Sequence, residues 1–479
     1  MTIKKSLGPP SAFLLAGTAS GVGKTTVTLA IIAALRRRGL VVQPFKGGPD
    51  FLDTGHQTRI AGRASRNLDT WMLSHESNRL VLQQAANGAD AVVVEGMMGL
   101  FDGKDGATEI GSSAEIAKVL KLPVVLVVDA GKSARSIAAV LLGFETFDPT
   151  LHLAGVILNR VASERHFRML EAAILSRCNT PILGWLPRSA SISIPERHLG
   201  LQTSEEHTDP AHAPEAQFEA LATLAESHIN LNHLLSLQCG ADLTPVPPPT
   251  LSIDTPRVRI GVARDGAFTF YYEDNLYLLQ KQGAEIIPFS PLQDRTLPVS
   301  LDALYLGGGY PELHAPQLSN NISMLKAIGE FVTSGRPVYA ECGGMMYLTR
   351  SITTKDTQVH KMVGALPFAV EMTSHLDRFG YVTVELAQDC LLGPVGTTVR
   401  GHSFHYSQIP DMTDDINAVL KNYRVDYSLS GRQEFEGFGL PKTNLLASYI
   451  HLHFRANPVI AHHFVATVRA ARAKSLVTA

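Results

Sequence analysis

Residues 17–26, GTASGVGKTT, are the first segment whose residue types and spacing could do chemistry. An apolar run precedes the segment and an apolar, helix-compatible run follows it, so the glycines would form the turn between a strand and a helix. Backbone N–H groups at such a helix N-terminus bind phosphate oxygens. A lysine there reaches the β- and γ-phosphates, and the next hydroxyl is a ligand for Mg²⁺. The segment predicts a phosphate-binding loop with the nucleotide-binding residues Gly21, Gly23, Lys24, Thr25 and Thr26.

The loop departs from the usual G-x-x-x-x-G-K-[ST] spacing in one place. Thr18 stands where the first glycine is expected, and Gly17 comes one position earlier. The alternative is a glycine-rich turn with a solvated lysine, but GVGKTT has the order and the flanking elements that a phosphate site requires.

Acidic residues stand where several strands should end, at Asp50, Glu95 and Asp102. Because the carboxyl ends of parallel strands line the ligand crevice of an open α/β sheet, these acids would meet the nucleotide. Mg²⁺ prefers oxygen ligands, so Thr25, Asp50 and Glu95 are predicted to surround it. The alternative is that the acids are solvated turn residues.

Two further polar residues end apolar runs in the same half. Asp129 ends the run VVLVVDA and Asn159 ends AGVILNR. Both are predicted to lie beside the nucleotide, where Asp129 would orient the nucleotide or the following helix.

Cys342 is the candidate nucleophile of the second half. The sequence PVYAECGGMMYL places it between an apolar strand and a helix-compatible run. A thiol at such an elbow stands at the positive end of a helix, which favours the thiolate. The glycines at 343 and 344 permit a tight turn, and their N–H groups could face an oxyanion. The alternative is an inert buried thiol, which the glycines disfavour.

A thiol nucleophile needs a base, and the sequence offers two histidine pairs. His451 and His453 lie in SYIHLHF, and His402 and His405 lie in RGHSFHYS. Two residues apart on a strand, His451 and His453 would point to the same face. Residue types and spacing leave the choice among the four open.

The elements that must position these residues form two α/β series. Unbroken apolar runs at 12–17, 91–96, 124–130 and 154–160 are typical of strands covered on both faces of a parallel sheet. A second series begins at 258–263 and continues at 303–309 and 337–342. Between them the proline cluster 245–249 is typical of a stiff linker. The sequence predicts two doubly wound α/β domains, at 1–235 and 257–479, joined by a linker at 236–256.

Composition excludes several classes of protein. The chain has 479 residues, more than the about 100–200 of one ordinary domain. Its formal charge of −2 gives no electrostatic basis for binding nucleic acid or an anionic membrane. The four cysteines lack the spacing of a zinc site or a disulfide scaffold, and no apolar stretch could span a bilayer. A cytoplasmic protein with small-molecule substrates is expected.

The first half resembles the dethiobiotin-synthetase-like P-loop enzymes, which carry a GT-x-x-x-VGKT loop and make acyl phosphates from ATP and a carboxylate. Partitioning-type ATPases share GVGKTT but have a lysine where this chain has Ala19. The second half resembles class I glutamine amidotransferase domains, in which the cysteine attacks the glutamine amide and releases ammonia. That resemblance implies His451 as the base. Most class I members have glutamate where this chain has His453, which implies a Cys–His dyad.

Taken together, the chain resembles the family of cobyrinic acid a,c-diamide synthases. The matching segments are GTASGVGKTT, KGGPDFLD, EGMMGLFDG, LGGGYPE, AECGGMMYL, GHSFHY and SYIHLHF. The related cobyric acid synthases lack GPDFLD and GLFDG, which favours the a,c-diamide type. The resemblance implies a cobalamin-pathway ligase that uses ATP, Mg²⁺ and glutamine to amidate the a- and c-acetates of cobyrinic acid through acyl phosphates. It implies Cys342, His451 and Asp102 as catalytic residues, with Asp102 near the corrin carboxylate or the acyl phosphate.

Three alternatives stay open at this point. The first is a sister amidase acting on hydrogenobyrinic acid or nickel sirohydrochlorin, because the sequence has no readable code for the tetrapyrrole polycarboxylate. The second is a nucleotide-switch ATPase with a partner-binding tail, and the third is a simple ligase using CO₂. The sequence also leaves a homodimer open.

Overall fold

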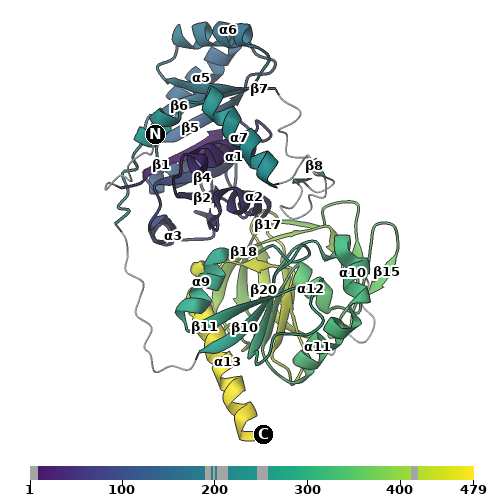
Figure 1. Ribbon diagram of the computed structural model, residues 1–479. Helices are drawn as coiled ribbons and strands as arrows, with labels where there is room; N and C mark the ends of the chain where they lie inside the picture. The colour runs from purple at the N-terminus through teal and green to yellow at the C-terminus, as the bar shows by residue number, and fades with distance from the viewer. Residues whose placement is uncertain are drawn as a thin grey trace. The chain divides into compact units, whose positions relative to one another are not determined.

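The computed structural model describes residues 9–188, 196–197, 200–201, 214–244, 257–410 and 419–478. The chain divides into two compact units, Met1–Pro247 and Pro248–Ala479, and each is described by itself (Figure 1). Residues 245–256 of the predicted linker 236–256, which include its proline cluster, lie outside the described residues.

The first unit is built on a seven-stranded sheet in which every pairing is parallel. Its central strands are buried along most of their length, as expected of unbroken valine, leucine and isoleucine runs covered on both faces. In spatial order the strands are β3 (Arg66–Leu68), β2 (Val42–Gly47), β4 (Ala91–Gly99), β1 (Ser11–Gly17), β5 (Val124–Asp129), β6 (Leu153–Val161) and β7 (Ile182–Pro187). A separate two-stranded sheet pairs β8 (Glu196–Arg197) with β9 (Gly200–Leu201).

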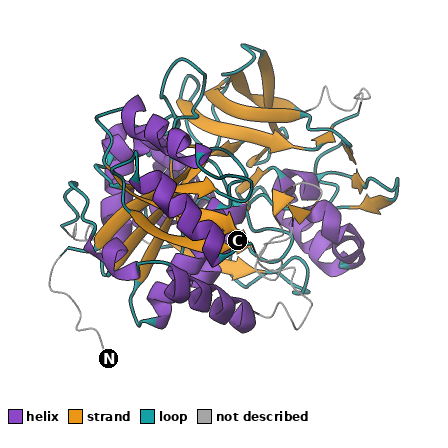
Figure 2. Ribbon diagram, turned by 90° about the horizontal axis from the view of Figure 1, so that it is seen from above, coloured by secondary structure: helices purple, strands orange, loops and turns teal. Residues whose placement is uncertain are grey.

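Helices connect and cover these strands (Figure 2). They are α1 (Lys24–Arg37), α2 (Leu52–Ala61), α3 (His75–Ala86), α4 (Ser113–Val119), α5 (Ser136–Phe147), α6 (Glu164–Leu175), α7 (Pro214–His228) and α8 (Leu231–Ser236). The helix α1 contacts strands β1, β2 and β4 and also packs against α7. Ten of its residues are therefore buried, which fixes the helix that begins at Lys24.

The second unit contains a ten-stranded mixed sheet. Parallel pairing joins β11 (Ala284–Phe289), β10 (Val258–Ala263), β12 (Ala303–Leu306), β13 (Val338–Glu341) and β22 (Leu445–Ser448). Antiparallel pairing continues the sheet through β21 (Gln433–Gly439), β20 (Leu420–Tyr427), β17 (Arg378–Leu386), β18 (Thr398–His405) and β23 (His451–Leu452).

Two apolar clusters form the core of this unit, one with residues of α11 and α12 and the other with residues of α9 and α13. The helical segments are α9 (Glu273–Lys281), η2 (Pro311–His314), α10 (Ala315–Asn320), α11 (Ile322–Thr333), α12 (Gly343–Leu348), η4 (Phe454–Ala456) and α13 (Val459–Thr478). A four-stranded sheet adds β15 (Val359–Lys361), β14 (Ser351–Thr353), β16 (Val370–Met372) and β19 (Ser407–Gln408).

The predicted α/β class is confirmed for both units. The predicted runs correspond to β1, β4, β5, β6, β10, β12 and β13. The antiparallel half of the second sheet was not predicted, because its strands expose one face and have no unbroken apolar run. Among the described residues, no helix combines the length and apolarity that crossing a membrane requires.

Candidate active sites

The predicted phosphate-binding loop connects β1 to α1. Gly21 and Gly23 have left-handed backbone, with φ of 76° and 91°. A Cβ at Gly23 would lie 2.1 Å from Nδ2 of Asn159, and that amide donates a 2.8 Å hydrogen bond to the Val22 carbonyl. Glycine is therefore required at position 23, and Asn159 holds the loop from its place on β6.

The side chain of Lys24 reaches back along the loop. Its Nζ donates to the carbonyl of Met98 at 2.5 Å and to that of Ala19 at 3.4 Å. Burial lowers the pKa of Lys24, and the Lys46 ammonium adds to the effect. An anion bound at the loop would favour the charged form of the Lys24 amine. The predicted nucleotide-binding residue Thr26 is half-buried and lies two residues after Lys24 on α1.

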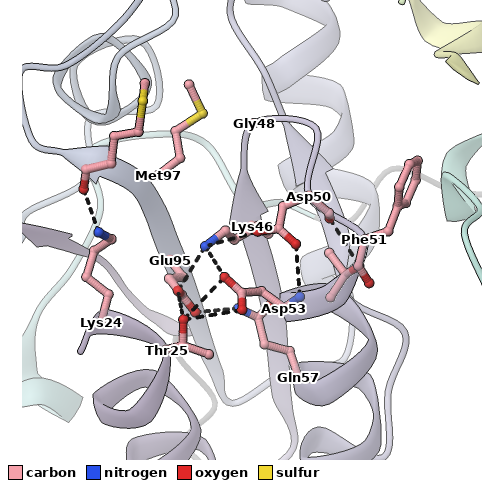
Figure 3. Close-up of polar contacts among 12 residues, drawn as sticks. Lys24, Thr25, Lys46, Gly48, Asp50, Phe51, Asp53, Gln57, Glu95 and Met97 are labelled. Carbon is pink, nitrogen blue, oxygen red and sulfur yellow. Dashed lines mark hydrogen bonds and ion pairs between the residues drawn. The ribbon is translucent and has the colours of Figure 1, made fainter. Parts of the chain in front are cut away.

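A hydroxyl and two carboxylates meet below the loop. The Thr25 hydroxyl lies 2.9 Å from Oε1 of Glu95 and 3.3 Å from both carboxylate oxygens of Asp53 (Figure 3). Glu95 is fully buried and Asp53 is almost so. Burial raises the pKa of Glu95, whereas the Lys46 ammonium and the Thr25 hydroxyl stabilise its charged form.

Lys46 supplies the positive charge of this cluster. It is the cross-strand neighbour of Glu95 in the parallel pairing of β2 with β4. Its Nζ lies 2.9 Å from Glu95 Oε1 and contacts Asp53. Burial opposes the charge, but Asp53 and Glu95 outweigh burial and raise the pKa of Lys46. Lys46 in turn holds the pKa of Asp53 below its usual value, although burial alone would raise it.

Asp53, for which the sequence predicted no role, lies closer to Thr25 than the predicted Asp50 does. Asp50 accepts a 2.9 Å hydrogen bond from the Asp53 backbone N–H at the start of α2 and lies 3.9 Å from Lys46 Nζ, with 37% of its side chain exposed. The acid that contacts Thr25 is Asp53, which the sequence reasoning missed. The available signal was its place in KGGPDFLD, where Asp53 is a second acid three residues after Asp50.

The oxygen atoms of this cluster are suited to Mg²⁺. Among the described residues, no set of three or more His, Cys, Asp or Glu side chains could hold a metal by itself. Mg²⁺ commonly takes one or two carboxylates and completes its shell with phosphate oxygens and water. The Thr25 hydroxyl and the carboxylates of Asp53 and Glu95 converge in that manner, so these residues fit the ion.

The other two predicted acids of this unit hold turns at strand ends. Asp102 accepts a 2.8 Å hydrogen bond from the Gly99 backbone N–H, directly after β4. Asp129 ends β5, accepts from the Gly131 N–H at 2.9 Å and pairs with Arg160 at 2.5 Å. Asp129 is the register partner of Asn159, so both stand at the same edge of the sheet as the loop.

In the second unit, Cys342 lies at a strained turn between β13 and α12. Its φ is 45° and its ψ is −107°, a conformation that non-glycine residues rarely adopt. Its N–H donates to the Ser448 carbonyl at 2.6 Å. A Cβ at Gly343 would lie 3.0 Å from Gly309 N, and one at Gly344 would lie 2.2 Å from the Leu306 carbonyl. The elbow is therefore packed directly against the loop that follows β12.

The Cys342 thiol is 6% exposed and belongs to the apolar core. Burial, with a smaller contribution from Glu312, raises its pKa to about 12. The sequence predicted that the helix end would favour the thiolate, but the cost of burying the charge is larger in the free protein. The Cys342 thiol therefore needs a base to become a nucleophile. All four cysteines are described by the structure, and all four are free thiols.

Three of the four candidate histidines lie close together: His402 on β18, His451 on β23, and His453 directly after β23. His402 is the register partner of His451, and their rings stack at 4.9 Å. His453 packs against Tyr272 at 4.3 Å, and the Tyr272 hydroxyl is hydrogen bonded to His402 Nδ1 at 2.9 Å. His405 is held apart by stacking on Tyr449 at 3.8 Å.

His451 borders the glycine loop that packs against the cysteine elbow. A Cβ at Gly308 would lie 2.4 Å from His451 Cε1 and 3.2 Å from its Nε2. Burial lowers the pKa of His451 to about 3, and His405 contributes. The imidazole is therefore neutral near pH 7 and able to accept a proton.

Gly308→Ala is expected to displace this imidazole. The added methyl group cannot occupy the same space as Cε1 of His451, so kcat for glutamine hydrolysis should fall by on the order of 10²-fold. Gly329→Ala in α11 is the matched control, since the nearest atom to its Cβ is 3.8 Å away. A steady-state assay of ammonia release measures both, and equal activity of the two variants would contradict the expectation.

Comparison with known proteins agrees with this division of sites. A family model described as the CobQ/CobB/MinD/ParA nucleotide binding domain matches residues 13–201, and the CobB/CobQ-like glutamine amidotransferase domain matches residues 259–459. A solved glutamine amidotransferase with 16% identity covers 44% of this chain and 98% of its own, with a TM-score of 0.31, a likeness too low to support an inference.

Curated relatives match nearly the whole chain. The cobyrinate a,c-diamide synthase of Listeria monocytogenes serotype 4b is 43% identical, over 95% of this chain and 99% of the relative. The synthase of Syntrophotalea carbinolica is 44% identical, over 94% and 97%, and that of Salmonella typhimurium is 42% identical, over 96% and 98%. The chain therefore belongs to the cobyrinate a,c-diamide synthase family.

Proposed function

We propose that this chain amidates the a- and c-acetate carboxylates of cobyrinic acid, with ATP as the activating nucleotide and glutamine as the nitrogen donor. The observation that carries the proposal is the presence, in one chain, of a phosphate loop backed by the Thr25–Asp53–Glu95 cluster and of a strained cysteine elbow. The names of the relatives support cobyrinate as the substrate and cobalamin biosynthesis as the setting.

The chemistry explains why both sites are needed. A carboxylate does not react with ammonia at neutral pH, because its oxygen is a poor leaving group. Transfer of the γ-phosphoryl group of ATP gives an acyl phosphate, and ammonia then displaces phosphate to give the amide. Lys24 would stabilise the charge on the transferred group, and Asp102 is proposed to lie near the corrin carboxylate or the acyl phosphate. Asp129 and Asn159 are proposed to bind the nucleotide.

Mg²⁺ would be held by Thr25, Asp50 and Glu95, with Asp53 added because of its contact with Thr25. When bound, the ion would neutralise charge on the phosphates. The chain's own contribution is to fix these oxygens around the first turn of α1.

Glutamine hydrolysis is assigned to the second unit. The Cys342 sulfur would attack the side-chain amide carbon of glutamine while His451 accepts the thiol proton. His451 would then return that proton to the amide nitrogen, the C–N bond would break, and ammonia would leave the thioester behind. The N–H groups of Gly343 and Gly344 are the proposed oxyanion donors. Water then hydrolyses the thioester and restores the thiol.

The substrate is tested by incubating the protein with ATP, glutamine and, separately, cobyrinic acid, hydrogenobyrinic acid and nickel sirohydrochlorin. High-resolution mass spectrometry should show two amidations of cobyrinic acid. A clear preference for either of the other macrocycles would replace cobyrinate as the substrate. Absence of glutaminase activity would instead favour the switch-ATPase alternative.

The acyl phosphate has its own test. With substrate carboxylates labelled with heavy oxygen, one labelled atom should appear in the released phosphate for each amide formed. Unlabelled phosphate would contradict the intermediate.

The domain limits 1–235 and 257–479 and the homodimer stay predictions. Limited proteolysis with mass mapping checks the limits, and analytical ultracentrifugation checks the homodimer.

A further inference from the structure

We infer that Glu341 is the acidic positioning residue of the glutaminase site, which orients the His451 imidazole and stabilises it once it has taken the Cys342 proton. The inference rests on the proposed roles of Cys342 and His451. A catalytic base of this kind needs a third group that fixes its ring.

Glu341 is next to the nucleophile in the sequence and lies beside the base. It is the last residue of β13 and directly precedes Cys342. Its Oε2 lies 3.9 Å from His451 Nδ1, and its Oε1 accepts a 3.1 Å hydrogen bond from the Leu452 backbone N–H. One carboxylate therefore contacts both the base and the strand that carries it. Such contacts are often long before substrate binds.

The carboxylate is itself held in place by tyrosines. Tyr305 donates a 2.9 Å hydrogen bond to Oε2, and Tyr339 donates a 2.6 Å hydrogen bond to Oε1. The Glu341 side chain is 1% exposed. With the Leu452 N–H, three donors converge on the two oxygens, which is the environment of an ionised carboxylate that accepts hydrogen bonds.

Two other acids among the described residues of this unit are less well placed. Asp377 lies 3.9 Å from His405 Nδ1, but that nitrogen is already hydrogen bonded to the Ser407 carbonyl at 2.8 Å. Glu436 is also buried, but its hydrogen bonds go to the Ser448 hydroxyl and the Tyr449 N–H. Glu341 is the acid that the structure places beside His451.

The proton balance shows what this carboxylate contributes. The S–H bond of Cys342 breaks, the proton passes to His451 Nε2, and the Nδ1–H of the resulting imidazolium faces Glu341. A charged Glu341 opposes a bare thiolate and is one cause of the raised pKa of Cys342. The charge of Glu341 favours the ion pair in which Cys342 is a thiolate and His451 carries the proton. Glu341 therefore couples activation of the thiol to proton transfer onto His451.

Glu341→Gln keeps the shape of the side chain and removes its charge. The new amide N–H would oppose an Nδ1–H, and so kcat for glutamine hydrolysis should fall by on the order of 10²- to 10⁴-fold. KM for glutamine should change little, and amidation with an ammonium salt should remain. Glu341→Asp, which restores the charge on a shorter chain, should recover part of kcat.

The dependence of kcat/KM on pH separates this role from a structural one. Burial raises the pKa of Glu341 to about 7, so the wild-type rate should rise through that pH as the carboxylate ionises, and Glu341→Gln should lose the rise. Around His451 stand His402 and His405, while the titratable groups around Glu341 are Tyr271, Tyr305, Tyr339, Cys342 and Tyr423.

Glu436→Gln is the matched control, since burial also raises the pKa of Glu436 to about 7. We expect it to keep the rise with pH and to lose much less of kcat. Equal losses in Glu341→Gln and Glu436→Gln, or an unchanged pH profile in Glu341→Gln, would overturn the inference while leaving the proposed function standing. A wild-type protein without glutaminase activity would overturn both.

Discussion

Cys342→Ala is expected to abolish glutamine-dependent amidation and to leave ammonia-dependent amidation intact. The substitution removes the sulfur and changes little else at a turn whose backbone already has φ of 45°. Loss of a covalent nucleophile should lower the glutamine-dependent rate by on the order of 10⁴-fold or more. The measurement is the amide yield by mass spectrometry with either glutamine or an ammonium salt.

Cys390→Ala is the matched control for that variant, because Cys390 is another free thiol of the same unit. It should behave as wild type with both nitrogen sources. If folded Cys342→Ala lost both activities, the two chemistries would not occupy separate sites.

Glu95→Gln is expected to lower kcat and kcat/KM together, by about 10²-fold or more, because the lost contact stabilises the transition state rather than substrate binding. The amide retains the shape of the carboxylate but removes the charge that faces Thr25 and Lys46. Steady-state kinetics of ADP release with varied corrin substrate measures the effect.

Thermal unfolding followed by circular dichroism reports whether the first unit of this variant is folded, and glutamine hydrolysis, which is assigned to the other unit, should be unchanged. Glu115→Gln provides a control acid within the first unit, where Glu115 bonds to Thr70 and the Gly111 N–H. We expect it to keep near-normal turnover. Unchanged turnover in Glu95→Gln would remove Glu95 from the site.

The parallel strands could be predicted because their apolar runs are unbroken. The run that contains Glu95 ends with an acid at the strand's carboxyl side, and the structure places that acid 2.9 Å from the Thr25 hydroxyl. The roles of these residues stay predictions. The strand β17 could not be found in this way, because exposed and buried residues alternate along much of it.

Two residues near the proposed sites could not be identified from the sequence, for different reasons. Asp53 lies within a helix, whereas the pattern that indicates ligand-binding acids in an open α/β sheet concerns strand ends. Glu341 lies inside PVYAEC, where the pattern indicates a core strand, and nothing local shows that its carboxylate meets a histidine 110 positions later. Contacts between distant segments depend on sheet order, which the sequence does not display.

Lys46 gives the first unit a built-in counter-ion. Asp53 and Glu95 are two anionic side chains in a medium of low polarity, where they would repel each other strongly. If a bound ion were their only counter-charge, loss of that ion would destabilise this part of the unit. Here the compensating ammonium is tethered to β2 and contacts both anions. The two carboxylates therefore keep a positive partner that belongs to the chain itself.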